Sequence, residues 1–168
     1  MSHDEQKVRQ QFFDEFGKKV NDTVHSLEMI CIQADKETFA DLKLTCTSLS
    51  GELWGLLVFC EKGLYFYVHP YESMMTVMLR QAAHGDPPKE QLLTLHTIPE
   101  LRFTVYPRRW YDILLGSARD RLVMSYKDAG GRTRCADIQC QGKAESVLDK
   151  INCQFVNIQG LDATSVIH

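Results

Sequence analysis

The sequence predicts a mainly β domain of the α+β class, in which antiparallel strands lie between two amphipathic helices. Three observations lead to this prediction. Segments 53–69 and 122–140 each contain two apolar or alternating runs joined by a short turn, which is typical of β-hairpins. Apolar residues at steps of four open the chain, and a helical spacing returns after Gly142. A run of strands flanked by helices favours an α+β fold.

Composition indicates one ordinary globular domain. The chain has 168 residues, of which 44% are hydrophobic and 24% charged, and its formal net charge is -3. A chain of this length can bury a core without a metal or disulfides, and this composition excludes broad disorder. The sequence contains no apolar run long enough to cross a bilayer, and a pI near 6.1 argues against nucleic-acid binding. We therefore expect no cofactor, no metal, no transmembrane insertion and no nucleic-acid partner.

The polar start of the chain predicts a cytoplasmic location, because a secretory signal would place an apolar stretch there. Six cysteines are an even number, yet several lie in strand-like apolar runs, where a reduced thiol behaves as a small hydrophobe. We expect them to be reduced. Cys135 and Cys140 are five positions apart and therefore face opposite sides of a strand, which argues against a zinc site.

Residues 1–27 are predicted to form an N-terminal amphipathic helix. Val8, Phe12, Phe16 and Val20 recur at steps of four, a series that continues to Val24. A glycine at position 17 lowers helix stability and allows a break into two shorter helices. The apolar face is expected to dock on the domain's own core, with partner binding or dimerisation as the alternative.

The central segment, 28–155, is predicted to be the main domain, followed by a loose tail over 156–168. We expect a strand at 42–46, a hairpin of 53–60 with 64–69 whose Gly63 is able to take a positive φ, and a helix over 71–84. Further strands are expected at 93–95, 101–105 and 110–115, then a hairpin of 122–126 with 136–140 and a helix over 144–155. About seven antiparallel strands in sequence form a meander, which can close into a barrel or pack as two sheets.

This order of elements resembles the pleckstrin-homology-like (PH-like) superfamily, and bacterial PH and GRAM-type domains in particular. The resemblance covers residues 38–155 and is carried by three segments: Gly51–Phe59, Glu61–Tyr67 and Arg121–Tyr126. It implies a seven-stranded barrel capped at one corner by the helix at 144–155, with the long N-terminal helix and the helix at 71–84 as additions. It also implies a binding function rather than catalysis.

Phosphoinositide binding is not expected. Members of the superfamily that bind these lipids carry several basic residues on the first two strands and the loop between them. Here that region offers only Lys43, and loop 48–52 contains an acid and no base.

One candidate site is the run Arg108, Arg109, Trp110 and Tyr111. Guanidinium groups beside an exposed aromatic can bind an anionic ligand, an acidic peptide or an anionic membrane surface. The alternative is that the arginines are solvated and Trp110 is turned into the core.

A second candidate is the methionine stripe of Met74, Met75 and Met78. Unbranched thioethers form an adaptable binding face, although such a stripe is also typical of a buried helix face. No catalytic motif is present, and the histidines have no metal-binding spacing.

The sequence thus predicts a non-enzymatic binding module that engages a protein partner, or a second copy of itself, through a sheet edge or the N-terminal helix. One alternative is a peripheral adaptor that binds weakly to anionic membrane surfaces or lipid headgroups. Another is a small-ligand carrier or enzyme with a barrel pocket lined by Tyr65, Tyr67 and Trp110.

Overall fold

The structure is a computed structural model that describes residues 3–70, 78, 81–82, 89–106 and 121–165. Its centre is a seven-stranded sheet with the order β4-β3-β2-β1-β7-β6-β5, in which every neighbouring pair is antiparallel. The strands are β1 (Val24–Gln33), β2 (Glu52–Cys60), β3 (Leu64–Val68), β4 (Gln91–Thr94), β5 (Arg102–Tyr106), β6 (Arg121–Lys127) and β7 (Thr133–Cys140).

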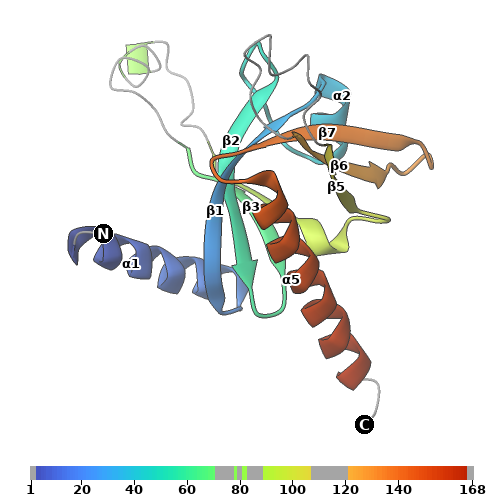
Figure 1. The fold of residues 1–168 in the computed structure, drawn as a ribbon. Helices are drawn as coiled ribbons and strands as arrows, with labels where there is room; N and C mark the ends of the chain where they lie inside the picture. The colour runs from blue at the N-terminus through green and yellow to red at the C-terminus, as the bar shows by residue number, and fades with distance from the viewer. Residues whose placement is uncertain (1–2, 71–77, 79–80, 83–88, 107–120, 166–168) are drawn as a thin grey trace.

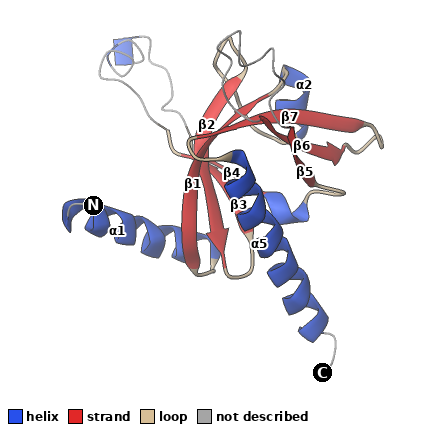
Figure 2. Ribbon diagram, viewed as in Figure 1, coloured by secondary structure: helices blue, strands red, loops and turns tan. Residues whose placement is uncertain are grey.

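The predicted α+β class and antiparallel sheet are confirmed, but the expected closure into a barrel is not found. Strands β4 and β5 lie at opposite ends of the sheet and are not paired with each other in the described part of the chain. The helices are α1 (His3–Val20), α2 (Lys36–Asp41), the short 3-10 helix η1 (Leu95–Thr97) and α5 (Ala144–Ser165). Figures 1 and 2 show α1 and α5 on opposite sides of strands β1–β3.

Helix α1 ends at Val20, which corrects the helix predicted to reach residue 27. Asn21 has a positive φ of 53°, and the Asp22 N–H donates to the Gly17 carbonyl at 3.0 Å. An asparagine in the left-handed region followed by this hydrogen bond is a common helix C-terminus, and it turns the chain into β1. Helix α1 is unbroken at Gly17, so the break that this glycine would allow does not occur.

The strand predicted at 42–46 is instead the C-cap of helix α2 (Lys36–Asp41) and the turn and loop that follow it. Asp35 caps the start of this helix, because its carboxylate accepts from the Thr38 N–H at 2.7 Å. At the other end Lys43 has a φ of 57°, and the Leu44 N–H donates to the Phe39 carbonyl at 2.8 Å. Leu42 and Leu44 are both buried. The alternation of apolar residues was therefore correct for burial and wrong for backbone conformation.

The inner face of the sheet carries the main core. Ile30, Ile32, Leu57, Phe66 and Met124 lie on this face with almost no exposure, and the first turns of α5 pack on it through Val147 and Ile151. Helix α5 continues to Ser165, so the loose tail predicted over 156–168 is helical in its described part.

Helix α5 also reaches the far hairpin of the sheet. Gln154 is 7% exposed, and its Nε2 donates to the carbonyl oxygens of Cys60 at 2.5 Å and Gly63 at 3.4 Å. Lys150 of the same helix forms an ion pair with Glu28 of β1. Helix α5 thus joins β5–β7 to strands β1–β3.

The outer face of the sheet, defined by Met29, Cys31 and Gln33 of β1 and the side chains level with them, is covered by α1 over only part of its area. Helix α1 packs a second apolar cluster against β2 and β3; its members are Phe12, Phe13, Phe16, Val20, Val24, Leu56, Val58, Cys60, Tyr65 and Tyr67. Lys19 of α1 pairs with Glu90 next to β4. Within the described ranges no helix packs on the rest of the outer face, where Met29 and Trp54 are 43% and 50% exposed.

The two predicted hairpins are confirmed as β2–β3 and β6–β7. The hairpin interpretation considered a positive φ at Gly63, but Gly63 does not have one. A Cβ at this position would lie 2.6 Å from the Tyr65 ring and 2.7 Å from His96 Cε1. Crowding by these two rings therefore explains this glycine. In the β6–β7 turn, Gly131 does have a positive φ, of 75°.

Candidate functional site

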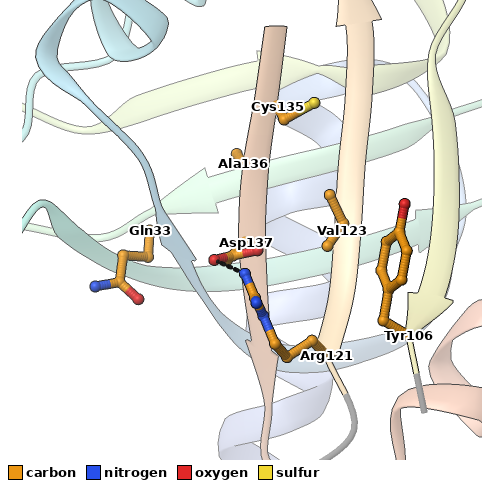
Figure 3. A pocket seen from close by; sticks show the side chains of 7 residues that line it. All are labelled: Gln33, Tyr106, Arg121, Val123, Cys135, Ala136 and Asp137. Atoms are coloured by element: carbon orange, nitrogen blue, oxygen red, sulfur yellow. Dashed lines mark hydrogen bonds and ion pairs between the residues drawn. The ribbon is translucent and has the colours of Figure 1, made fainter. Parts of the chain in front are cut away.

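The uncovered outer face contains an open groove of about 400 Å³, here called the outer groove. Its lining comes from four strands and consists of Gln33, Tyr106, Arg121, Val123, Cys135, Ala136 and Asp137. Figure 3 shows Arg121 and Asp137 joined at the centre, with Tyr106 on one side and Gln33 on the other.

Strand register places these side chains together. Tyr106 of β5 is opposite Arg121 of β6, and Val123 is opposite Asp137 of β7, which is in turn opposite Gln33 of β1. Side chains directly opposite one another in antiparallel strands lie on the same face, and Arg121 and Val123 are two positions apart on β6, so these side chains form two adjacent rows on the outer face.

Arg121 and Asp137 form an ion pair in which a guanidinium nitrogen lies 2.5 Å from a carboxylate oxygen. The Arg121 side chain is 66% exposed and that of Asp137 is 36% exposed. An exposed pair of this kind contributes little to stability, about 0–1 kcal/mol. Arginine has five N–H donors, so Arg121 retains donors that can bind a carboxylate of a ligand.

The outer face over β5–β7 has an excess of positive charge. Among its described side chains, Arg102, Arg121 and Lys127 are cationic, and Asp137 is the only carboxylate. This part of the face is therefore electrostatically suited to an acidic ligand, although the whole chain is slightly acidic.

A large aromatic side chain continues this surface onto β2. Trp54 is 50% exposed, and it is opposite Cys31, which is opposite Gln139 of β7. Met29 is 43% exposed on the same face, and its sulfur accepts from Gln141 Nε2 at 3.2 Å. Trp54 and Met29 thus form a partly exposed apolar area on the outer face, the kind of surface that a partner can cover.

The cysteines fall into two groups. Burial raises the pKa of Cys60 to about 12 and the pKa values of Cys31 and Cys140 to about 11, so these thiols remain protonated at neutral pH. Cys135 in the outer groove is exposed. No group of histidine, cysteine and carboxylate side chains able to hold a metal ion occurs among the residues that the structure describes.

Most of the candidate site residues named from the sequence lie outside the part of the chain that the structure describes. Arg108, Arg109, Trp110 and Tyr111 lie outside the described residues, as do Met74 and Met75. Met78 is described, and its side chain is 65% exposed.

The aromatic pair proposed to line a barrel pocket packs against helix α1. Tyr65 and Tyr67 are 9% and 6% exposed, and the rings of both lie against Phe16 of α1. Burial raises the pKa of Tyr67 to about 12, with a hydrogen bond to Glu90 as a further cause.

Sequence reasoning missed the outer groove and Trp54 as sites. The available signal was the position of Trp54 and Tyr106 in strands that also carry outward-facing polar residues.

No family model, no curated protein and no solved structure matches this chain. Within the described ranges, no helix combines the length and the apolar character needed to cross a membrane.

Proposed function

We propose that the protein is a non-enzymatic binding module of PH-like type that engages a protein partner, or a second copy of itself, through the outer face of its sheet. The seven antiparallel strands followed by a helix that packs on the inner face support the resemblance drawn from the sequence. A fold of this kind presents strands and loops for recognition, and function is then decided by the surface it carries.

The observation that carries the proposal is the exposure of Trp54 near the start of β2. Tryptophan, tyrosine and arginine are the side chains that most often dominate the energy of protein interfaces. Here Trp54 is continuous with Tyr106 and Arg121 along the outer face. Removing apolar area from water contributes about 25 cal/mol per Å², so burial of the exposed half of Trp54 can provide about 2–3 kcal/mol.

The test is a quantitative capture experiment with the full chain. Wild-type protein and Trp54→Ala are immobilised, exposed to extract of the source cells, and the retained proteins are compared by mass spectrometry. The matched control is Leu49→Ala, which removes a fully exposed apolar side chain from a loop. Light scattering on the free proteins detects self-association through the same face.

The proposal predicts that a specific protein, or the dimer, is retained by the wild type and by Leu49→Ala and lost with Trp54→Ala. It is refuted if all three proteins retain the same set and have the same mass in solution. Sedimentation with phosphatidylserine vesicles that depends on Trp54 would favour the membrane-adaptor alternative instead.

A further inference from the structure

The sheet has two end strands, β4 and β5. On β4, the side-chain amide of Gln91 forms two hydrogen bonds with the main chain of Thr45. The Thr45 N–H donates to Gln91 Oε1 at 2.6 Å, and Gln91 Nε2 donates to the Thr45 carbonyl oxygen at 3.0 Å. At the other end, β5 pairs with β6 on one side, and the described part of the chain provides no strand on its other side. An edge strand of this kind has a row of N–H and C=O groups able to pair with another strand.

The side chains of β5 alternate between the inner face and an exposed outer face. Phe103 points to the inner face, where its ring centre lies 6.3 Å from that of Phe155 on α5. Arg102, Thr104 and Tyr106 alternate with it and are exposed. Helix α5 thus covers the inner side of β5 and not its outer side.

The positive charge of Arg102 and Arg121 on the outer face of β5 and β6 favours a bound segment that is acidic. Arg102 lies on β5 itself, so a strand added at the edge would bring its own side chains within about 5 Å of Arg102. Arg121 lies on β6, about two strand spacings or 10 Å from such a strand, which is near the Debye length at physiological ionic strength. Both cations favour carboxylates, and Arg102 has the larger effect.

We propose that the β5 edge binds an extended acidic segment of a partner protein, whose main chain adds a strand to the sheet and whose carboxylates face Arg102. The inference rests on the proposed binding function and names the partner chemistry at one end of the same face. Main-chain hydrogen bonds provide affinity in such pairing, and side chains on alternate positions provide selectivity.

The experiment uses the full chain and short labelled peptides in which threonine alternates with glutamate or, as the comparison, with lysine. Two further glutamate peptides carry N-methyl groups on alternate amides, one set facing β5 and the other facing away. Fluorescence anisotropy measures affinity at low salt and at about 0.15 M, and amide chemical shifts in NMR spectra locate the contact.

The glutamate peptide is expected to bind more tightly than the lysine peptide, to shift the β5 amides, and to lose binding in one N-methylated form but not in the other. Arg102→Glu should weaken binding roughly fivefold at low salt and Arg121→Glu by less, in line with single exposed charge pairs. The control Lys36→Glu, an exposed charge reversal on α2, should leave binding unchanged.

Equal binding of the glutamate and lysine peptides, equal loss in both N-methylated forms, or no detectable binding would each overturn the inference. These outcomes are separate from the test of Trp54. If Trp54→Ala loses its partner while the peptides show no selectivity, the proposed function stands and pairing at the β5 edge is wrong.

Discussion

Replacing Gly55 by alanine is expected to destabilise the protein by overpacking its core. Gly55 lies in the middle of β2, on the inner face and opposite Ile30. A Cβ at this position would be 2.7 Å from Cε2 and Cζ of Phe66 and 2.7 Å from the Tyr67 carbonyl oxygen. Ordinary contacts between carbon atoms are about 3.5–4.0 Å, so the ring must move by roughly 0.8 Å or more. Phe66 is fully buried and has little room to move.

The size of the effect follows from two opposing contributions. Overpacking a close-packed core typically costs about 1–3 kcal/mol, and the backbone obstacle at Tyr67 indicates the upper end of that range. Alanine also restricts the unfolded chain, which offsets about 0.5–1 kcal/mol. The net loss in the free energy of unfolding is therefore about 2 kcal/mol, which corresponds to a fall in Tm of about 4–8 °C for a domain of this length.

The assay is urea unfolding monitored by circular dichroism, together with thermal melting, for Gly55→Ala, Phe66→Leu and the double variant. Because the smaller side chain removes the ring that the new methyl would touch, the double variant should be more stable than the sum of the single effects predicts. Gly142→Ala is the control, since no atom lies within 4 Å of its Cβ position. A Gly55→Ala protein with wild-type stability, or strict additivity in the cycle, would refute the reasoning.

Two further predictions concern the thiols and helix α1. At pH 8, Ellman's reagent should modify the exposed Cys135 and Cys153 rapidly and leave the buried Cys31, Cys60 and Cys140 unreacted until the protein is unfolded; rapid modification of Cys60 would contradict this. Burial raises the pKa of these three thiols from 9.0 to about 11–12. Above pH 9 the unfolded chain therefore loses thiol protons that the folded state keeps, which favours unfolding. Tm should be insensitive to the titration of these thiols below pH 9 and should decrease above it. Gly17→Ala should fail to give the gain of about 1 kcal/mol usual inside a helix, because the new Cβ would be 2.7 Å from the Asp22 carbonyl oxygen; a higher urea midpoint than wild type would show that this contact relaxes.

Local patterns in the sequence were sufficient to predict the fold class, both hairpins and the start of α5, since these depend on short-range periodicity and turn residues. Strand β1 was missed because Val24 continues the step-of-four series of the preceding helix, although β1 begins at that residue. The useful signal was Asn21, a residue that tolerates the left-handed conformation at a helix C-terminus.

The outer groove could not be predicted in the same way. Gln33, Tyr106, Arg121 and Asp137 belong to four strands, and they come together only through the pairing of β1 with β7 and of β6 with both its neighbours. Single-sequence patterns do not determine which distant strands become neighbours or in which register. The exposure of Trp54 depends on where α1 crosses the sheet, which is likewise a long-range property.

The pairing of β1 with β7 also has a consequence for how the polypeptide acquires its structure during synthesis. β1 is made early, yet one of its long sides meets a neighbour that is translated only after most of the chain, with Ile30 contacting Cys140 across the ladder. Until then the nascent half-sheet of β1–β4 presents an unsatisfied edge, which is a hazard for intermolecular aggregation. Pairing of strands so far apart in the sequence also favours slow folding, because the chain between them must be closed into a loop first.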